Sequence, residues 1–162
     1  MDCVFTFPKR VINAGTPHFH AHPTPTLTSD FVEMSGIPLV DGQRFILRTV
    51  RSGWLSVGAA FQNSQGNIDL TLLTDTNRLV GRSATQANQE RIDALVEANQ
   101  TYTVVITGNN PNATLRFGNQ VSRQGNSWQI FGTSREDAFQ FDAASGGFTI
   151  NGFNYQLAAG QA

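Results

Sequence analysis

The sequence has a single cysteine, a single lysine and few charged residues, and each scarcity excludes a class of protein. Cys3 alone cannot form an internal disulfide or a cysteine-rich zinc site. Lys9 leaves almost no place for a Schiff-base lysine or for the phosphate-binding lysine of a P-loop. The ten arginines are spread from Arg10 to Arg135, and the net charge is −1. Because nucleic-acid-binding proteins carry a basic face, we expect no nucleic-acid partner.

Long apolar runs are also missing. No stretch approaches the roughly 20 apolar residues of a membrane-spanning helix, so no membrane span is expected. The first residues, MDCVFTFPKRVINAG, lack the positively charged start and the continuous apolar core of a signal peptide. The protein is then either intracellular or a segment of a longer secreted chain.

The motifs of common catalytic sites are absent. The sequence contains neither a G-x-S-x-G nucleophile elbow nor a G-x-G-x-x-G phosphate loop. All three histidines, His18, His20 and His22, fall in one N-terminal stretch, which a Ser-His-Asp triad would have to recruit. Glu136 and Asp137 are adjacent, so in a strand they point to opposite faces and cannot act as an acid–base pair. We expect that the protein is not an enzyme.

Strand and turn residues, by contrast, are abundant. The sequence has 12 Phe and 15 Gly with many Thr and Asn, and only 14% of its residues are charged. Phe and Thr favour strands, and Gly and Asn favour the turns between them. From about Phe31 onward, short apolar runs with strand-like alternation are separated by turn signals. The clearest runs are QRFILRTV (43–50), GWLSVGAAF (53–61), NIDLTLLT (67–74), QTYTVVIT (100–107) and ATLRF (113–117).

One segment is ambiguous between helix and strand. ATQANQERIDALVEAN (84–99) is rich in good helix formers. However, Ile92, Ala94 and Val96 alternate with their neighbours as in a half-buried strand. We predict a strand at about 90–96.

After Phe117 the apolar runs become still shorter: WQIF (128–131), AFQF (138–141), GFTI (147–150) and FNYQL (153–157). Asn151-Gly152 separates the last two runs and predicts a hairpin, because a type I′ turn needs positive φ at both central residues. Strands this frequent, with no helix between them, predict an antiparallel all-β protein.

The chain divides into three regions on this pattern. Residues 1–29 contain four prolines and predict a leader with little regular structure. Residues 30–118 predict a β-sandwich module, and residues 119–162 predict an appendage of short β-strands. The expected fold is antiparallel and all-β, with a small C-terminal β-hairpin appendage.

Residues of about 36–117 resemble the bacterial pre-peptidase C-terminal domain. The matching features, in order, are the strand pair FILRTVRSGWLSVGAAF, the segment GNIDLTLL, Ser83 with NQERI, and VEANQTYTVVITG. Asn99 stands where the family usually has glycine, and Asn tolerates the left-handed geometry of that turn. The tail GTSREDAFQFDAASGGFTINGFNYQL is similar to the short β repeats of large bacterial surface proteins.

This resemblance implies a jelly-roll-like antiparallel β-sandwich, a non-catalytic module appended to exported or cell-surface proteins. Its expected roles are adhesion, targeting or spacing, and its expected partner is an extracellular protein or a polysaccharide. Relatives in collagenases bind collagen and calcium, so the resemblance also implies a calcium site. The first acidic position of the family pattern is Asn67 in this sequence, which weakens a calcium site.

Asp69 has two candidate roles. It lies between apolar residues in GNIDLTLL (66–73), and an unpaired carboxylate on a buried face is costly. Asp69 binds calcium with Asn67 and with Asp75 or Asp93, or its carboxylate accepts hydrogen bonds from the backbone of a neighbouring turn. Calcium takes about six to eight oxygen ligands, so this thin set favours the structural role.

HFHAH (18–22) is the other candidate metal site. In a strand its three histidines share one face, with neighbouring Cα atoms roughly 6.6 Å apart, which suits zinc. The flanking prolines favour polyproline II instead, in which alternate residues splay apart. A solvated segment is therefore the preferred interpretation of these histidines.

Trp54 and Trp128 are the candidate ligand-binding residues. Together with Tyr102 and Tyr155 they could line a carbohydrate-binding platform, because flat aromatic rings stack on sugar rings. Aromatic residues more often pack in the core, and Trp54 lies beside an expected hairpin turn at Ser52-Gly53. A carbohydrate-binding module is thus the alternative to the accessory module, and no cofactor is required by either.

Overall fold

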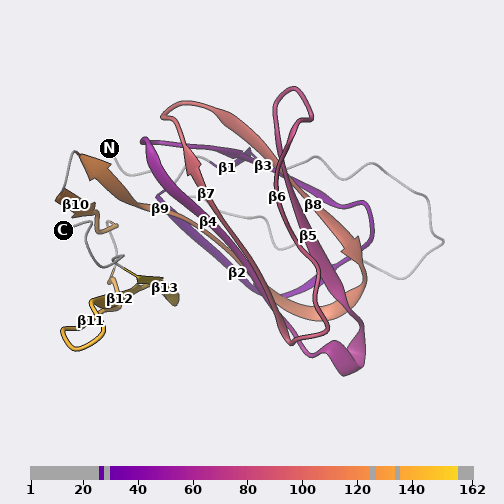
Figure 1. The fold of residues 1–162 in the computed structure, drawn as a ribbon. Coiled ribbons are helices and arrows are strands. Elements are labelled where there is room, and N and C mark those ends of the chain that lie inside the picture. The colour runs from indigo at the N-terminus through magenta and orange to yellow at the C-terminus, as the bar shows by residue number, and fades with distance from the viewer. Residues whose placement is uncertain (1–25, 28–29, 125–126, 134–135, 157–162) are drawn as a thin grey trace.

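The computed structural model describes residues 26–27, 30–124, 127–133 and 136–156, and it is all-β as predicted (Figure 1). The only helix in this part of the chain is a 3-10 turn, η1 (Asn63–Gln65). No helix within these ranges is long and apolar enough to cross a membrane. Two sheets pack face to face as a β-sandwich, and a third, smaller sheet follows at the C-terminal end.

Sheet A is the first layer of the sandwich. Its strand order is β1-β3-β8-β5-β6, and its neighbours are antiparallel except for the parallel pair β1 and β3. The strands are β1 (Thr26–Leu27), β3 (Arg44–Arg48), β5 (Ile68–Thr74), β6 (Leu79–Ser83) and β8 (Thr101–Gly108).

Sheet B is the second layer. Its order is β10-β9-β4-β7, and β2 also pairs with β9. The strands are β2 (Phe31–Leu39), β4 (Gly53–Ala60), β7 (Gln89–Val96), β9 (Asn110–Gln124) and β10 (Ser127–Ile130). The ambiguous segment 84–99 is thus a strand, β7, as predicted.

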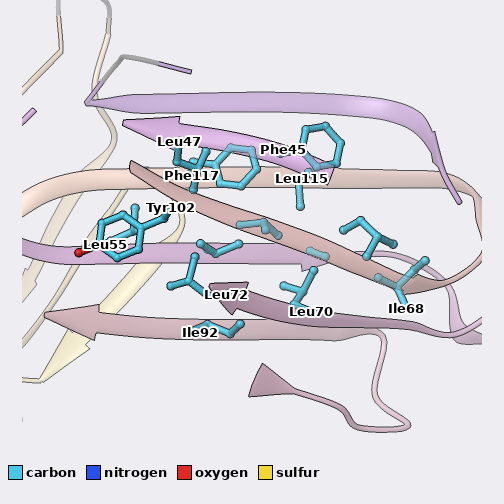
Figure 2. Close-up of a cluster of buried hydrophobic side chains, with 14 of the residues drawn as sticks. Phe45, Leu47, Leu55, Ile68, Leu70, Leu72, Ile92, Tyr102, Leu115 and Phe117 are labelled. Atoms are coloured by element: carbon cyan, nitrogen blue, oxygen red, sulfur yellow. The ribbon is translucent and has the colours of Figure 1, made fainter. Parts of the chain in front are cut away.

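The core lies between these two layers because apolar residues alternate along nearly every strand (Figure 2). Phe45 of sheet A contacts Phe117 of sheet B, with ring centroids 6.0 Å apart. The fully or almost fully buried residues include Leu47, Leu55, Val57, Ile68, Leu70, Leu72, Val104, Ile106 and Leu115. This alternation also determines which residues point outward from each sheet.

Sheet C is a three-stranded antiparallel sheet of β11 (Phe139–Asp142), β12 (Gly147–Ile150) and β13 (Phe153–Gln156). The predicted hairpin is confirmed: Asn151 and Gly152 have φ of 48° and 82°, as a type I′ turn requires. β11 corresponds to the run AFQF (138–141) and adds a third strand to this hairpin. The boundary expected at residue 118 falls inside β9, which runs on to Gln124.

Sheet C packs on the outer face of sheet B through a second apolar cluster, whose buried members are Val121, Phe148, Ile150, Phe153 and Tyr155. Phe153 lies over two glycines of adjacent strands. A Cβ atom on Gly118 would stand 2.9 Å from the Phe153 ring, and one on Gly58 would stand 3.1 Å from it. The ring therefore occupies space that any larger residue at these positions would fill.

A polar contact holds the same two sheets together. The Asn151 side-chain amide donates to Oε1 of Gln120 at 3.0 Å and to Oδ1 of Asp137 at 2.7 Å. Gln120 is buried in β9, and this hydrogen bond satisfies its amide oxygen. The donated bond from Asn151 is also the main reason that the pKa of Asp137 lies below its usual value.

Three strands went unrecognised in the sequence: β1, β2 and β6. β1 lies in the region 1–29, which was expected to have little regular structure. β2 contains Gly36 and Pro38 and is interrupted by two register shifts opposite β9. Proline is tolerated there because β2 is an edge strand, where a missing N–H breaks no ladder. β6 is a short edge strand with few buried residues, so it lacks a clear alternating pattern.

Gly118→Ala tests the packing of the Phe153 ring on Gly118. We expect it to lower the free energy of unfolding by about 1–3 kcal/mol, because the added methyl group overpacks the contact. Denaturant unfolding measures this loss. The matched variant Gly118→Ala/Phe153→Leu should lose less than the sum of the two single changes, since the smaller side chain makes room. Strictly additive losses would contradict this packing arrangement.

Candidate functional site

A hollow of about 160 Å³ opens on the outer face of sheet B beside sheet C, and it unites the two tryptophans singled out in the sequence. Trp54 and Trp128 line it together with Phe148 and Tyr155. The remaining lining residues are polar: Arg91, Asp93, Asn154 and Gln156. We call this feature the tryptophan hollow.

The long strand β9 brings the two tryptophans together. Trp54 points outward from β4 because its neighbour Leu55 points into the core. Opposite Trp54, β9 presents Val121, and a register shift separates this pair from the next. β10 pairs with the same end of β9, where Ile130 faces Val121 and Trp128 faces Arg123. Both tryptophans are half-buried and pack against the second apolar cluster.

Sheet C supplies the opposite wall. Phe148 and Tyr155 are directly opposed residues of β12 and β13. Their rings stack with centroids 5.1 Å apart and planes inclined by 19°. Because Phe153 anchors β13 on sheet B, this stacked pair is held against the same face that carries Trp54.

An ion pair crosses the polar side of the hollow. Nε of Arg91 donates to Oδ2 of Asp93 at 2.9 Å, and its Nη2 donates to Oδ1 at 3.0 Å. Nη2 also donates to the Asn154 backbone oxygen at 2.7 Å, which ties β7 to β13. The guanidinium lies 5.2 Å from the centroid of the Phe153 ring and 5.3 Å from that of Tyr155. The two charged side chains in the lining therefore neutralise each other.

A chain of hydroxyl groups continues from this ion pair beneath sheet C. The buried Ser56 hydroxyl donates to Oδ1 of Asp93 at 2.5 Å and lies 2.8 Å from the Tyr155 hydroxyl. A carboxylate only accepts, so Ser56 uses its one proton on Asp93 and the Tyr155 hydroxyl donates to Ser56. This fixed chain orients the Tyr155 ring in the wall of the hollow.

The burial of Tyr155 predicts a pH dependence. Loss of solvent raises the pKa of Tyr155 above its ordinary value of 10.0, and the negative charge of Asp93 adds to the rise, while the positive charge of Arg91 opposes it. The unfolded chain thus releases this proton at lower pH than the folded chain. Stability from this group is complete below about pH 10 and is lost as pH rises further.

We expect Tyr155→Phe to flatten the loss of stability above about pH 10, as measured by denaturant unfolding across pH. At neutral pH the same variant should lose about 0.5–1.5 kcal/mol with the hydrogen bond to Ser56. Tyrosinate absorbance provides the check in the native protein. A tyrosine that titrates at its ordinary pKa and disappears in Tyr155→Phe would contradict the burial of this hydroxyl.

Asp69 lies on the outer face of sheet A, where its side chain is 18% exposed and its carboxylate is paired. It points outward from β5 because Ile68 and Leu70 point inward. Its Oδ1 accepts a hydrogen bond from Nδ2 of Asn67 at 2.8 Å, and its Oδ2 lies 3.6 Å from a nitrogen of Arg82. The partners of Asp69 are therefore side chains, not the backbone of a turn.

The structure does not bring the three positions named for calcium, Asn67, Asp69 and Asp75, together at one point. Asp75 follows the end of β5, so five residues of extended strand, roughly 17 Å, separate it from Asp69. Asn67 directs its amide nitrogen at Asp69, and Arg82 supplies the countercharge that a cation would supply. Within the described ranges, no three His, Cys, Asp or Glu residues are grouped to hold a metal. His18, His20 and His22 lie outside the described residues.

We accordingly expect calcium to leave thermal stability unchanged. The melting temperature in excess calcium should equal that in EDTA, and Asp69→Ala should cost about 1 kcal/mol, because its partners are one side-chain amide and a largely exposed arginine. A ligand at a hundred times its dissociation constant would add about 2.7 kcal/mol. A calcium-dependent rise of several degrees that Asp69→Ala abolishes would overturn this expectation.

The sequence identified part of the tryptophan hollow. Trp54, Trp128 and Tyr155 meet there, whereas Tyr102 is buried in the main core. Sequence reasoning missed the polar side of the site. Arg91 and Asp93 carried a usable signal, because they occupy the outward positions of the predicted strand 90–96. Phe148, Asn154 and Gln156 gave no comparable signal.

No family model and no curated protein matches this chain. Among solved structures, it is similar to the pre-peptidase C-terminal domain of a collagenase from Bacillus anthracis, at 10% identity and TM-score 0.43, over 61% of this chain and 98% of that chain. It is also similar to a periplasmic inhibitor of g-type lysozyme from Aeromonas hydrophila, at 10% identity and TM-score 0.37, over 57% and 94%. The first is a domain of the family that residues 36–117 resemble. At these identities the likeness concerns the fold alone.

Proposed function

We propose that this chain is a non-catalytic accessory module of an exported or cell-surface protein, and that it binds a polysaccharide in the tryptophan hollow. The observation that carries this proposal is the meeting of Trp54 and Trp128, from strands far apart in the sequence, at one hollow. Adhesion or targeting follows from such binding.

The lining has the chemistry that a sugar ring needs. A sugar presents C–H groups on its faces, which pack on aromatic rings, and hydroxyls around its edge, which need hydrogen-bond partners. Trp54 and Trp128 supply aromatic surface, and Asn154 and Gln156 supply polar groups at the margin. An apolar surface with a few placed polar groups is the usual composition of a ligand site.

The size and charge of the tryptophan hollow limit the kinds of ligand that it can bind. Its volume of about 160 Å³ lies below the roughly 300 Å³ at which sites for drug-sized molecules begin, so it suits one ring of a longer polymer. The ion pair of Arg91 and Asp93 leaves no net charge to attract an ionic ligand. Neutral polysaccharides therefore fit better than acidic ones.

The same lining supports binding without hydrolysis. Glycoside hydrolysis ordinarily uses two carboxylic acids that flank the scissile bond. Asp93 is the one acid that lines the hollow, and its oxygens are already occupied by Arg91 and Ser56. An acid held in this way is a structural group.

Native electrophoresis in gels that contain soluble polysaccharides tests the proposal. Neutral polysaccharides should retard the protein, and acidic ones should retard it less. Trp54→Ala and Trp128→Ala should each weaken binding at least about tenfold, since loss of a central aromatic contact costs more than about 1.4 kcal/mol. Leu79→Ala, an exposed position on β6 of sheet A, is the matched control and should bind normally.

The melting temperature of each tryptophan variant separates lost binding from lost folding. Retardation that persists in folded Trp54→Ala and Trp128→Ala would exclude the tryptophan hollow as the binding site. Absence of retardation by every polysaccharide would exclude the carbohydrate ligand. Fractionation of the producing cells, with the protein found only in the cytoplasm, would exclude the exported or cell-surface location.

A further inference from the structure

β11 is an exposed edge strand with an apolar side. It pairs with β12 on one edge, and no described residue pairs with its other edge. All four of its residues are exposed, and Phe139 and Phe141 are each 54% exposed. In Figure 1, β11 lies on the side of sheet C away from the sandwich. A soluble domain usually protects such an edge with charge, proline or a covering segment.

The direction of the backbone groups along β11 is set by its pairing with β12. The backbone oxygen of Ala138 accepts a hydrogen bond from the Asn151 N–H at 2.9 Å, so residue 138 directs its groups toward β12. In an antiparallel ladder, successive residues direct their N–H and C=O groups to opposite edges. Phe139 and Phe141 therefore direct theirs to the open edge.

The two phenylalanine side chains also share one face. Phe139 is opposite Ile150, and Phe141 is opposite Phe148, so both continue the apolar face that packs on sheet B. The ring of Phe139 lies 6.2 Å from that of Phe148. The open edge thus combines unused backbone groups with an uncovered strip of the apolar face.

We propose that a second copy of this chain pairs with β11 across a two-fold axis through Gln140. In this antiparallel register, Phe139 faces Phe141 of the partner subunit, and Phe141 faces the partner's Phe139. Each such pair exchanges two backbone hydrogen bonds, so the two pairs use all four groups of each open edge. The phenylalanines come together on one face, and two copies of sheet C form one continuous sheet.

In this register the sequence Phe-Gln-Phe pairs with itself so that each phenylalanine faces a phenylalanine. The flanking charged residues do not oppose this pairing. Asp142 faces the partner's Ala138, so like charges are not directly opposed. The Asp142 carboxylate is also held in its own turn, where it accepts hydrogen bonds from the Ala144 N–H and the Ser145 hydroxyl. Registers shifted by two residues would pair only one phenylalanine with its equivalent and lose this match.

Pairing through one short strand buries little surface compared with a stable interface, which covers at least about 1,200 Å². The dimer should therefore be weak and dependent on concentration. The Arg91–Asp93 ion pair contacts β13, and β12 lies between β13 and β11, so pairing at the open edge of β11 leaves this side of each hollow free. A dimer would then present two tryptophan hollows. Two linked sites bind a polymer more tightly than either site alone.

A disulfide trap tests the register. In a Cys3→Ser background, Gln140→Cys should form a disulfide-linked dimer under mild oxidation, because residue 140 faces its own copy. Such non-hydrogen-bonded pairs place Cα atoms roughly 4.5 Å apart, within the range of about 4.4–6.8 Å that a disulfide spans. Ala138→Cys is the matched control: it is equally exposed but faces residue 142, so it should remain largely reduced.

Sedimentation across a range of concentrations tests the association itself. The native chain should shift from monomer toward dimer, and Phe139→Ser/Phe141→Ser should remain monomeric with a near-native melting temperature. Leu79→Ser, an exposed apolar position on edge strand β6, should associate like the native chain. A native chain that stays monomeric at high concentration, or equal cross-linking of Gln140→Cys and Ala138→Cys, would overturn the proposal.

Discussion

The seating of Phe153 on Gly58 and Gly118 is the contact on which the C-terminal half of the molecule depends. Two glycines on adjacent strands leave the outer face of sheet B open at one place, and the ring fills it. Phe153 begins β13, so its position sets the position of sheet C. Without that contact, nothing would hold the stacked pair of Phe148 and Tyr155 opposite Trp54.

Polar contacts make this arrangement specific where apolar packing alone would allow sliding. Asn151 binds both Gln120 and Asp137, and Arg91 binds both Asp93 and the backbone of Asn154. Each of these side chains has directional hydrogen bonds that only one placement of sheet C satisfies. Arg91 and Asp93 also neutralise each other, so the surface of the tryptophan hollow is aromatic and carries no net charge.

Sheet C thus has two different surfaces. Its inner part covers sheet B, and with Trp54 and Trp128 it encloses the tryptophan hollow. Its outer strand, β11, continues the same apolar face beyond sheet B, where nothing among the described residues covers Phe139 and Phe141. A single alternating pattern of aromatic residues therefore lines the tryptophan hollow and also leaves an exposed apolar edge at β11.

Local signals in the sequence determined the all-β class, most strands and two turns. Alternation identified β7 despite its helix-forming residues, and the tolerance of asparagine for positive φ accounts for Asn99 and Asn151. These features depend on neighbours within a few residues, which the sequence states directly. β2 escaped notice because its glycine and proline are acceptable only at the edge of a sheet, and edges are a tertiary property.

Only the tertiary structure decided what the functional residues do. The sequence placed Asp69 in a strand, but the side that faces water depends on which sheet covers the other side. It singled out Trp54 and Trp128, but their meeting depends on the pairing of β4 and β10 with one end of β9. Alternation shows which residues of a strand share a face. Which partner lies across each face is a matter of strand order and register, and these arise from contacts between residues far apart in the chain.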